Sequence, residues 1–175
     1  MKTLQTTVLL LSFLLVNLFT YAQEKSLYYK EIVVENPEPE ATIKILSDYV
    51  SALVYDKMEM VEILLDEKYI GYGPSINDSI NKKETLESWT KVHKYRTNEK
   101  VEFVSQTFRV IKGNHKGDWV SQWGTYSYML NGKTIEMPYQ LTARIKDNKI
   151  ISSRIYYDNL EVAKELGYEV IPPKN

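Results

Sequence analysis

The chain has 175 residues, with 22 basic and 23 acidic side chains that leave a formal net charge of −1. This even balance gives no sign of a nucleic-acid or anionic-membrane partner. Because cysteine is absent, disulfides, thiol nucleophiles and thiolate metal sites are excluded.

The first 22 residues have the layout of a cleaved secretory signal. Lys2 is their only charge, an apolar run covers 8–19, and Ala22 is the small residue that precedes the expected cleavage. The run is shorter than the roughly 20 apolar residues of a membrane anchor, although an uncleaved anchor is the alternative. We therefore expect a bacterial protein that is exported to the periplasm or secreted, with no membrane partner after cleavage.

Apolar positions at helical spacing dominate the next part of the chain. A polar lead segment over 23–37 includes a predicted strand at 27–34. Proline and acidic residues then favour a helix start. The apolar periodicity predicts a first helix over about 40–55 and a short second helix around 60–65.

A brief strand and a third helix are predicted next. Residues 69–72 have the strand pattern, which ends at Gly73-Pro74. Asn81 and Glu84 have the spacing of a capping box, and the helix that they begin continues through His93.

Strand patterns fill the second half of the chain. Four runs cover 99–112, 118–130, 133–146 and 149–157, and the pairs Asn131-Gly132 and Asp147-Asn148 separate the last three. Asn-Gly between two strand-like runs is a strong hairpin signal. Helices followed by such a meander indicate an α+β fold, in which the helices lie across the apolar face of a curved antiparallel sheet.

The run at 133–146 shows the clearest alternation of apolar and polar residues. We expect one set of side chains to face the helices, namely Ile135, Met137, Tyr139, Leu141, Ala143 and Ile145. The opposite face would carry Gln140, Thr142 and Arg144. A register slip of one residue would exchange the two sets.

Four short segments carry a resemblance to a known family. They are Tyr49-Val50-Ser51-Ala52-Leu53, Trp123-Gly124-Thr125, the hairpin at 144–150, and Tyr156-Tyr157-Asp158 with Leu166-Gly167. In this order they resemble the nuclear transport factor 2-like superfamily, which includes SnoaL-like cyclases and ketosteroid isomerases. The resemblance implies a cone-shaped, cystatin-like α+β barrel over 38–167 with an apolar cavity, followed by a tail at 168–175. It also implies a homodimer through the outer face of the sheet.

The resemblance disfavours ketosteroid isomerase chemistry. Tyr49 matches the family's oxyanion-binding tyrosine, but Gly73 stands where those enzymes carry the general-base aspartate. The protonated acid of the oxyanion hole falls at Leu141, or at Gln140 if the alignment is anchored on Pro138. Neither residue is an acid, and general acid–base steps typically contribute about 10²–10⁴-fold. We interpret Tyr49 first as a core tyrosine.

The implied cavity would be lined by aromatic and apolar side chains. The candidate ligand-binding residues are Tyr49, Tyr72, Trp89, His93, Tyr139, Leu141 and Tyr157. The two histidines, His93 and His115, lack metal-ligand spacing, so no metal or other cofactor is expected. A basic cluster over 91–100, which Glu99 interrupts, is interpreted as a solvated face.

Asp158 is the candidate catalytic residue, because the resemblance places the acid/base aspartate of SnoaL-like cyclases at the matching end of the last strand. The alternation of that strand favours other residues for the cavity face, namely Ile151, Ser153, Ile155 and Tyr157. Asp158 and Glu161 also have the spacing of a helix N-cap with an acid at N3, before a helix that Leu166-Gly167 would close. We favour the capping role.

Three functions remain open from the sequence. The preferred one is an exported pocket protein that binds a small, largely apolar ligand. The alternatives are a cofactor-free cyclase, isomerase or dehydratase that uses Asp158, and a non-catalytic dimeric interaction module. Two buried ionisable groups converging on the cavity would favour the enzyme, and an all-apolar cavity would favour the carrier.

Overall fold

The computed structural model describes residues 28–169 and residue 171. The predicted signal peptide at 1–22 lies outside these residues. Twelve elements follow one another: α2 (Tyr29–Ile32), β1 (Val33–Val34), α3 (Pro39–Val54), α4 (Met58–Leu64), β2 (Leu65–Tyr72), β3 (Ser79–Asn81), α5 (Lys82–Val92), β4 (Thr97–Val110), β5 (Gly117–Leu130), β6 (Lys133–Lys146), β7 (Lys149–Tyr157) and α6 (Asn159–Glu165). The α+β class and the order of elements agree with the prediction.

One mixed sheet forms the body of the molecule. Its seven strands are ordered β1-β4-β5-β6-β7-β2-β3. The strands β4 to β7 form the predicted antiparallel meander, but β2 pairs with β7 in parallel. The prediction of a wholly antiparallel sheet was therefore wrong at this pair. Only strands joined by a short hairpin have their relative direction fixed locally, and β2 reaches β7 through a long connection.

The turns of the meander have the predicted hairpin chemistry. Asn131 and Gly132 have φ angles of 52° and 77°, and Asp147 and Asn148 have φ angles of 51° and 59°. Two consecutive positive φ angles match the twist of paired strands, and Asn, Asp and Gly tolerate them best. These turns set the register of β5, β6 and β7.

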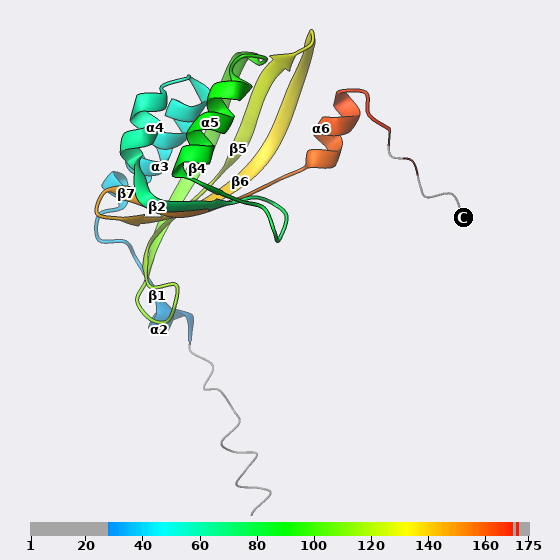
Figure 1. The fold of residues 1–175 in the computed structure, drawn as a ribbon. Helices are drawn as coiled ribbons and strands as arrows, with labels where there is room; N and C mark the ends of the chain where they lie inside the picture. Colours follow the sequence, from blue (N-terminus) through cyan, green and yellow to red (C-terminus); the bar gives the residue numbers. More distant parts are fainter. Residues whose placement is uncertain (1–27, 170, 172–175) are drawn as a thin grey trace, which may run out of the picture.

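Three helices, α3, α4 and α5, lie together against one face of the sheet (Figure 1). The core between these layers includes Leu46 and Leu53 of α3, Val61 of α4, and Val120 and Ile135 of the sheet. The C-terminal helix α6 follows the meander and contacts β6. No helix among the described residues is long and apolar enough to cross a membrane.

The predicted faces of β6 are confirmed. The side chains expected to face the helices are buried, except that of Met137, which is half-buried, and Ile135 and Ala143 are the most buried of them. Gln140 is exposed, and Arg144 is half-buried on the opposite side. The register is therefore the one that the alternation predicts.

The N-terminal strand prediction was wrong over most of its length. Residues Tyr29–Ile32 form one helical turn, and only Val33 and Val34 form a strand. This short strand pairs with the end of β4, Val33 with Val110 and Val34 with Arg109.

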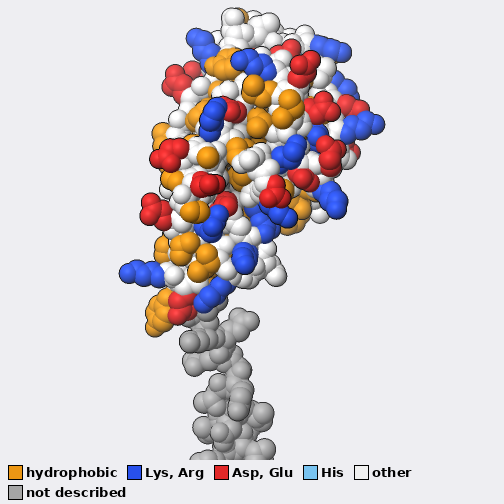
Figure 2. All heavy atoms as spheres, turned by 90° about the vertical axis from the view of Figure 1, so that its left-hand side faces the viewer, with side chains coloured by type: hydrophobic (Ala, Val, Ile, Leu, Met, Phe, Trp, Pro, Cys, Tyr) orange, Lys and Arg blue, Asp and Glu red, His pale blue; other side chains and the backbone are white. Residues whose placement is uncertain are grey.

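On the face that Figure 2 shows, acidic, basic and hydrophobic side chains are interspersed.

Candidate functional site

A cavity of about 330 Å³ lies between the helices and the sheet. Its walls come from α3, α5, α6 and the four strands of the meander, together with the turn before β4. The lining is mostly aliphatic and aromatic and includes Val50, Leu53, Val54, Trp89, Val92, Val101, Met137, Ile155 and Val162. Small-molecule sites are typically apolar cavities of this size with a few polar groups that orient the ligand.

Four of the seven predicted ligand-binding residues line this cavity. They are Trp89 from α5, Tyr139 and Leu141 from β6, and Tyr157 from β7. The Tyr139 hydroxyl donates a hydrogen bond to Oε1 of Gln122 at 2.9 Å, and burial raises the pKa of Tyr139. Tyr139 therefore presents its ring to the cavity, while its hydroxyl is held by the sheet.

Two predicted residues lie elsewhere. Tyr49 is 4% exposed and packs in the core beside Tyr69, whose hydroxyl is 2.7 Å from Oγ of Ser153. Burial first, and then the neighbouring Tyr69, raise the pKa of Tyr49. Tyr72 is an exposed residue whose ring lies under the Arg154 guanidinium at 4.7 Å. Tyr49 is therefore a core tyrosine, as the sequence analysis favoured. Neither Tyr49 nor Tyr72 is part of the cavity lining.

Asp158 caps the N-terminus of α6. Its carboxylate oxygen Oδ1 accepts hydrogen bonds from the backbone N–H groups of Leu160 at 2.9 Å and Glu161 at 3.0 Å. The favoured capping role is confirmed, and Asp158 is not among the residues that line the cavity. The helix α6 ends at Glu165, and Leu166 is its C-cap residue. Gly167 follows with a φ angle of +93°.

A buried polar cluster closes one end of the cavity. His93 ends α5, and its Nδ1 atom is 2.6 Å from Oε1 of Glu99 on β4. The side chains of His93 and Glu99 are only 10% and 8% exposed. The Tyr126 hydroxyl donates a short hydrogen bond to Oε2 of Glu99, and Nη1 of Arg96 donates to the same hydroxyl at 3.3 Å. Of these four residues, Arg96 and Tyr126 line the cavity, whereas His93 and Glu99 lie behind it.

The cluster has two electrostatic features. Burial first, and then the hydrogen bond to Glu99, raise the pKa of Tyr126, so its hydroxyl keeps its proton. Nε2 of His93 is buried and has no hydrogen-bond partner among the described residues. Oδ1 of Asp56 lies 3.8 Å from this atom. His93 therefore lies between two carboxylates and next to Trp89, with ring centroids 5.7 Å apart.

The interpretation of the basic cluster over 91–100 as a solvated face holds for Lys91, Lys94 and Lys100, which are exposed, but not for Arg96, which is half-buried like the intervening Glu99. Glu99 shares the inner face of β4 with Val101 and Phe103, because these three residues alternate with the exposed Lys100 and Glu102. The alternation with those two residues was the signal that could have identified Glu99.

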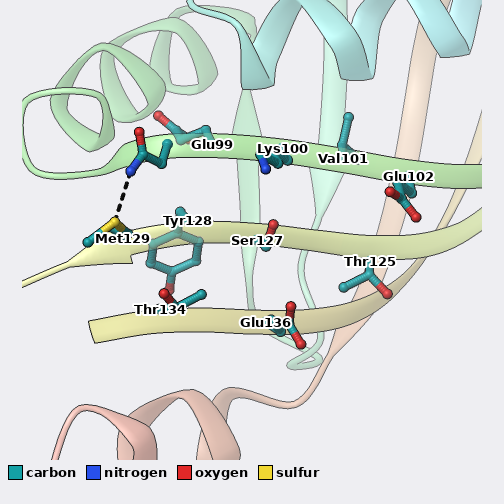
Figure 3. Close-up of a pocket in the computed structure, with 11 residues that line it drawn as sticks. Glu99, Lys100, Val101, Glu102, Thr125, Ser127, Tyr128, Met129, Thr134 and Glu136 are labelled. Carbon is teal, nitrogen blue, oxygen red and sulfur yellow. Dashed lines mark hydrogen bonds between the residues drawn. The ribbon is translucent and has the colours of Figure 1, made fainter. Parts of the chain in front are cut away.

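A second, larger hollow of about 700 Å³ runs along β4, β5 and the start of β6 (Figure 3). Polar side chains dominate its lining, including Lys100, Glu102, Thr125, Ser127 and Glu136. Figure 3 shows that the Glu99 side chain points toward the helices, away from Glu102 and Glu136. We place the candidate site in the smaller cavity, because its apolar walls and buried polar end suit a small ligand better.

Comparison with known proteins identifies the fold through structure. No family model matches the chain, and no curated protein matches it in sequence. An LEH-like epoxide hydrolase of M. tuberculosis is 15% identical, with a TM-score of 0.59 over 74% of this chain and 92% of that one. IdmH of Streptomyces antibioticus, a candidate polyketide cyclase, is 13% identical, with a TM-score of 0.59 over 73% and 99%. 

A third solved structure agrees with these two. A nuclear transport factor 2-like protein of Burkholderia xenovorans is 15% identical, with a TM-score of 0.56 over 74% of this chain and 98% of that one. The match spans almost the full length of these neighbours. This chain therefore has the nuclear transport factor 2-like fold.

Proposed function

We propose that the protein is an exported pocket protein that holds one small, largely apolar ligand between the helices and the sheet. The cavity and its aliphatic and aromatic lining carry this proposal. A volume of about 330 Å³ lies at the small end of the range for ligand cavities, so we expect a small ligand.

The fluorescence of Trp89 offers a direct binding test. We expect 1-octanol to change the emission of the purified protein at saturable concentrations, and Trp89→Phe to remove that change. Val101→Phe should weaken binding because it fills the cavity from β4. Val104→Phe is the matched control, because Val104 is 59% exposed and on the opposite face of the same strand. Equal binding by both valine variants would contradict the cavity as the site.

Export is part of the same proposal. Residues 1–22 carry the secretory pattern, and intact mass of the protein recovered outside the cytoplasm is the test. A mass that corresponds to a chain beginning at Gln23 would support export with cleavage. A mature chain that still begins at Met1 would contradict cleavage.

A cofactor-free enzyme is the second candidate, and the buried cluster of His93, Glu99 and Tyr126 favours it. Paired ionisable groups beside a cavity are typical of acid–base sites. In this candidate Glu99, and not Asp158, would supply the acid/base group. Because one structural neighbour is an LEH-like epoxide hydrolase, styrene oxide is a suitable test substrate. Glu99→Gln should abolish turnover and leave 1-octanol binding intact, and turnover that survives this substitution would exclude Glu99.

The third candidate is a dimer formed through the outer face of the sheet. Val104, Trp123, Gln140 and Tyr156 are register partners in a row across β4 to β7. Val104, Trp123 and Tyr156 are 59%, 43% and 52% exposed, so the row presents apolar surface. Sedimentation equilibrium should show a dimer that Trp123→Glu converts to a monomer. A monomeric native protein would contradict this candidate.

A further inference from the structure

Arg96 gives the cavity a positive charge. Of the described residues that line the cavity, it is the only one with a charged side chain. It lies in the turn between α5 and β4, where its backbone N–H bonds to the carbonyl of Val92 at 3.1 Å. The last turn of α5 therefore fixes the backbone of Arg96 beside the buried polar cluster, where its side chain contacts Tyr126.

The guanidinium is held by aromatic rings and not by an acid. Its central carbon is 4.1 Å from the ring centroid of Tyr128 and 5.7 Å from that of Tyr126. Its hydrogen bond to the Tyr126 hydroxyl is long, at 3.3 Å. Within the described part of the chain Arg96 forms no ion pair. A guanidinium has five N–H donors, so most of them remain available to a ligand.

The nearby Glu99 does not occupy these donors. One of its carboxylate oxygens faces Nδ1 of His93, and the other accepts from the Tyr126 hydroxyl. Tyr126 thus stands between the carboxylate and Arg96. The remaining walls are mostly apolar, so an anion that reached Arg96 would lose much of its hydration, and a charge-assisted hydrogen bond to the guanidinium would offset that cost.

We infer that the ligand is a small amphipathic molecule, with an apolar body and a carboxylate or similar anionic group that Arg96 binds. This inference rests on the proposed ligand-binding function and adds the class and orientation of the ligand. The anionic group would lie beside Arg96 and Tyr126, and the apolar body would extend along Leu141 and Val101.

Calorimetric titration with octanoate and octanamide tests this inference, because the two probes have the same number of non-hydrogen atoms and differ in charge. Octanoate should bind at least about tenfold more tightly to the native protein. Arg96→Gln should remove this preference by weakening octanoate binding, and Arg96→Lys should retain part of it. Arg154→Gln is the matched control, because Arg154 also lies over a tyrosine ring, that of Tyr72, outside the cavity lining.

The outcomes separate the inference from the proposed function. Equal binding of the two probes by the native protein would overturn the inference and leave the pocket function standing. A preference for octanoate that survives in Arg96→Gln, or that is lost in Arg154→Gln, would also overturn it. Binding of neither probe would overturn both the inference and the pocket function for ligands of this size. If Arg96→Gln does not fold, the native comparison and Arg96→Lys decide.

Discussion

The hydrogen bond between Tyr126 and Glu99 should contribute measurably to stability, because both side chains are almost completely buried. Tyr126 is 4% exposed and the Glu99 side chain 8%. Replacing Tyr126 by Phe leaves Oε2 of Glu99 without its hydroxyl donor. Hydrogen bonds to charged groups typically contribute about 1.5–3 kcal/mol. We therefore expect Tyr126→Phe to lower the free energy of unfolding by about 2 kcal/mol.

Urea unfolding of a double-mutant cycle measures this interaction directly. Glu99→Gln removes the charge, so Tyr126→Phe should cost less in that background, and the difference should be about 1 kcal/mol or more. Tyr128→Phe is the matched control, since Tyr128 lies two residues further along β5 and its ring is 5.1 Å from that of Tyr126. If Tyr126→Phe costs no more than Tyr128→Phe, or shows no coupling to Glu99→Gln, the assigned hydrogen bond is wrong.

Three further predictions concern other parts of the fold. Asp158→Ala should lower the free energy of unfolding by about 0.5–2 kcal/mol in urea titrations, whereas Asp158→Asn should be nearly neutral because Asn caps about as well as Asp. Gly124→Ala should cost roughly 1–3 kcal/mol by the same measurement, because a Cβ at this position would overlap the carbonyl oxygen of Glu102 on β4. Burial raises the pKa of Tyr126 and Tyr139 above the ordinary 10.0, so the unfolded chain loses these protons first. Their contribution to stability should be complete below pH 10 and fall as the pH rises above it, and Tyr139→Phe should reduce that loss in unfolding measured at about pH 11.

The sequence predicted the meander well, because its turns and alternation are local signals. Asn131-Gly132 and Asp147-Asn148 adopt the positive φ angles that their residue types favour. The alternation on β6 then determined which side chains face the helices. The capping box of α5 was equally local, and the side chains of Asn81 and Glu84 both take part in it.

A bulge accounts for the one failure on β7. On β7, Arg144 pairs with Ser152 and Ile145 with Ile150, so Ile151 is an extra residue. The expected cavity face held for Ile155 and Tyr157, which line the cavity. It did not hold at Ile151, because the bulge makes Ile150 the buried residue at the start of the strand. Strict alternation cannot locate such an extra residue.

The site could be predicted only as far as the resemblance extends. It implied the cavity and led to Trp89, Tyr139, Leu141 and Tyr157, all of which line it. The resemblance also led to Asp158, which is instead the N-cap residue of α6. Of the buried polar cluster only His93 was predicted, and Arg96, Glu99 and Tyr126 were missed because residues distant in sequence assemble the cluster. Arg96 meets Tyr126 across 30 positions of the chain, and no local pattern records that contact.

The protonation of the cavity lining favours ligand binding over proton abstraction. Tyr126 and Tyr139 both keep their protons, because burial raises the pKa of each, and the Tyr139 hydroxyl already donates to Gln122. Arg96 is a donor only. The carboxylate of Glu99 is behind the lining, with both oxygens engaged. Because both tyrosine hydroxyls already donate within the protein, Arg96 supplies the free N–H donors and the positive charge of the described lining, which suit an anionic ligand. Catalysis by Glu99 would first require Tyr126 to release the carboxylate.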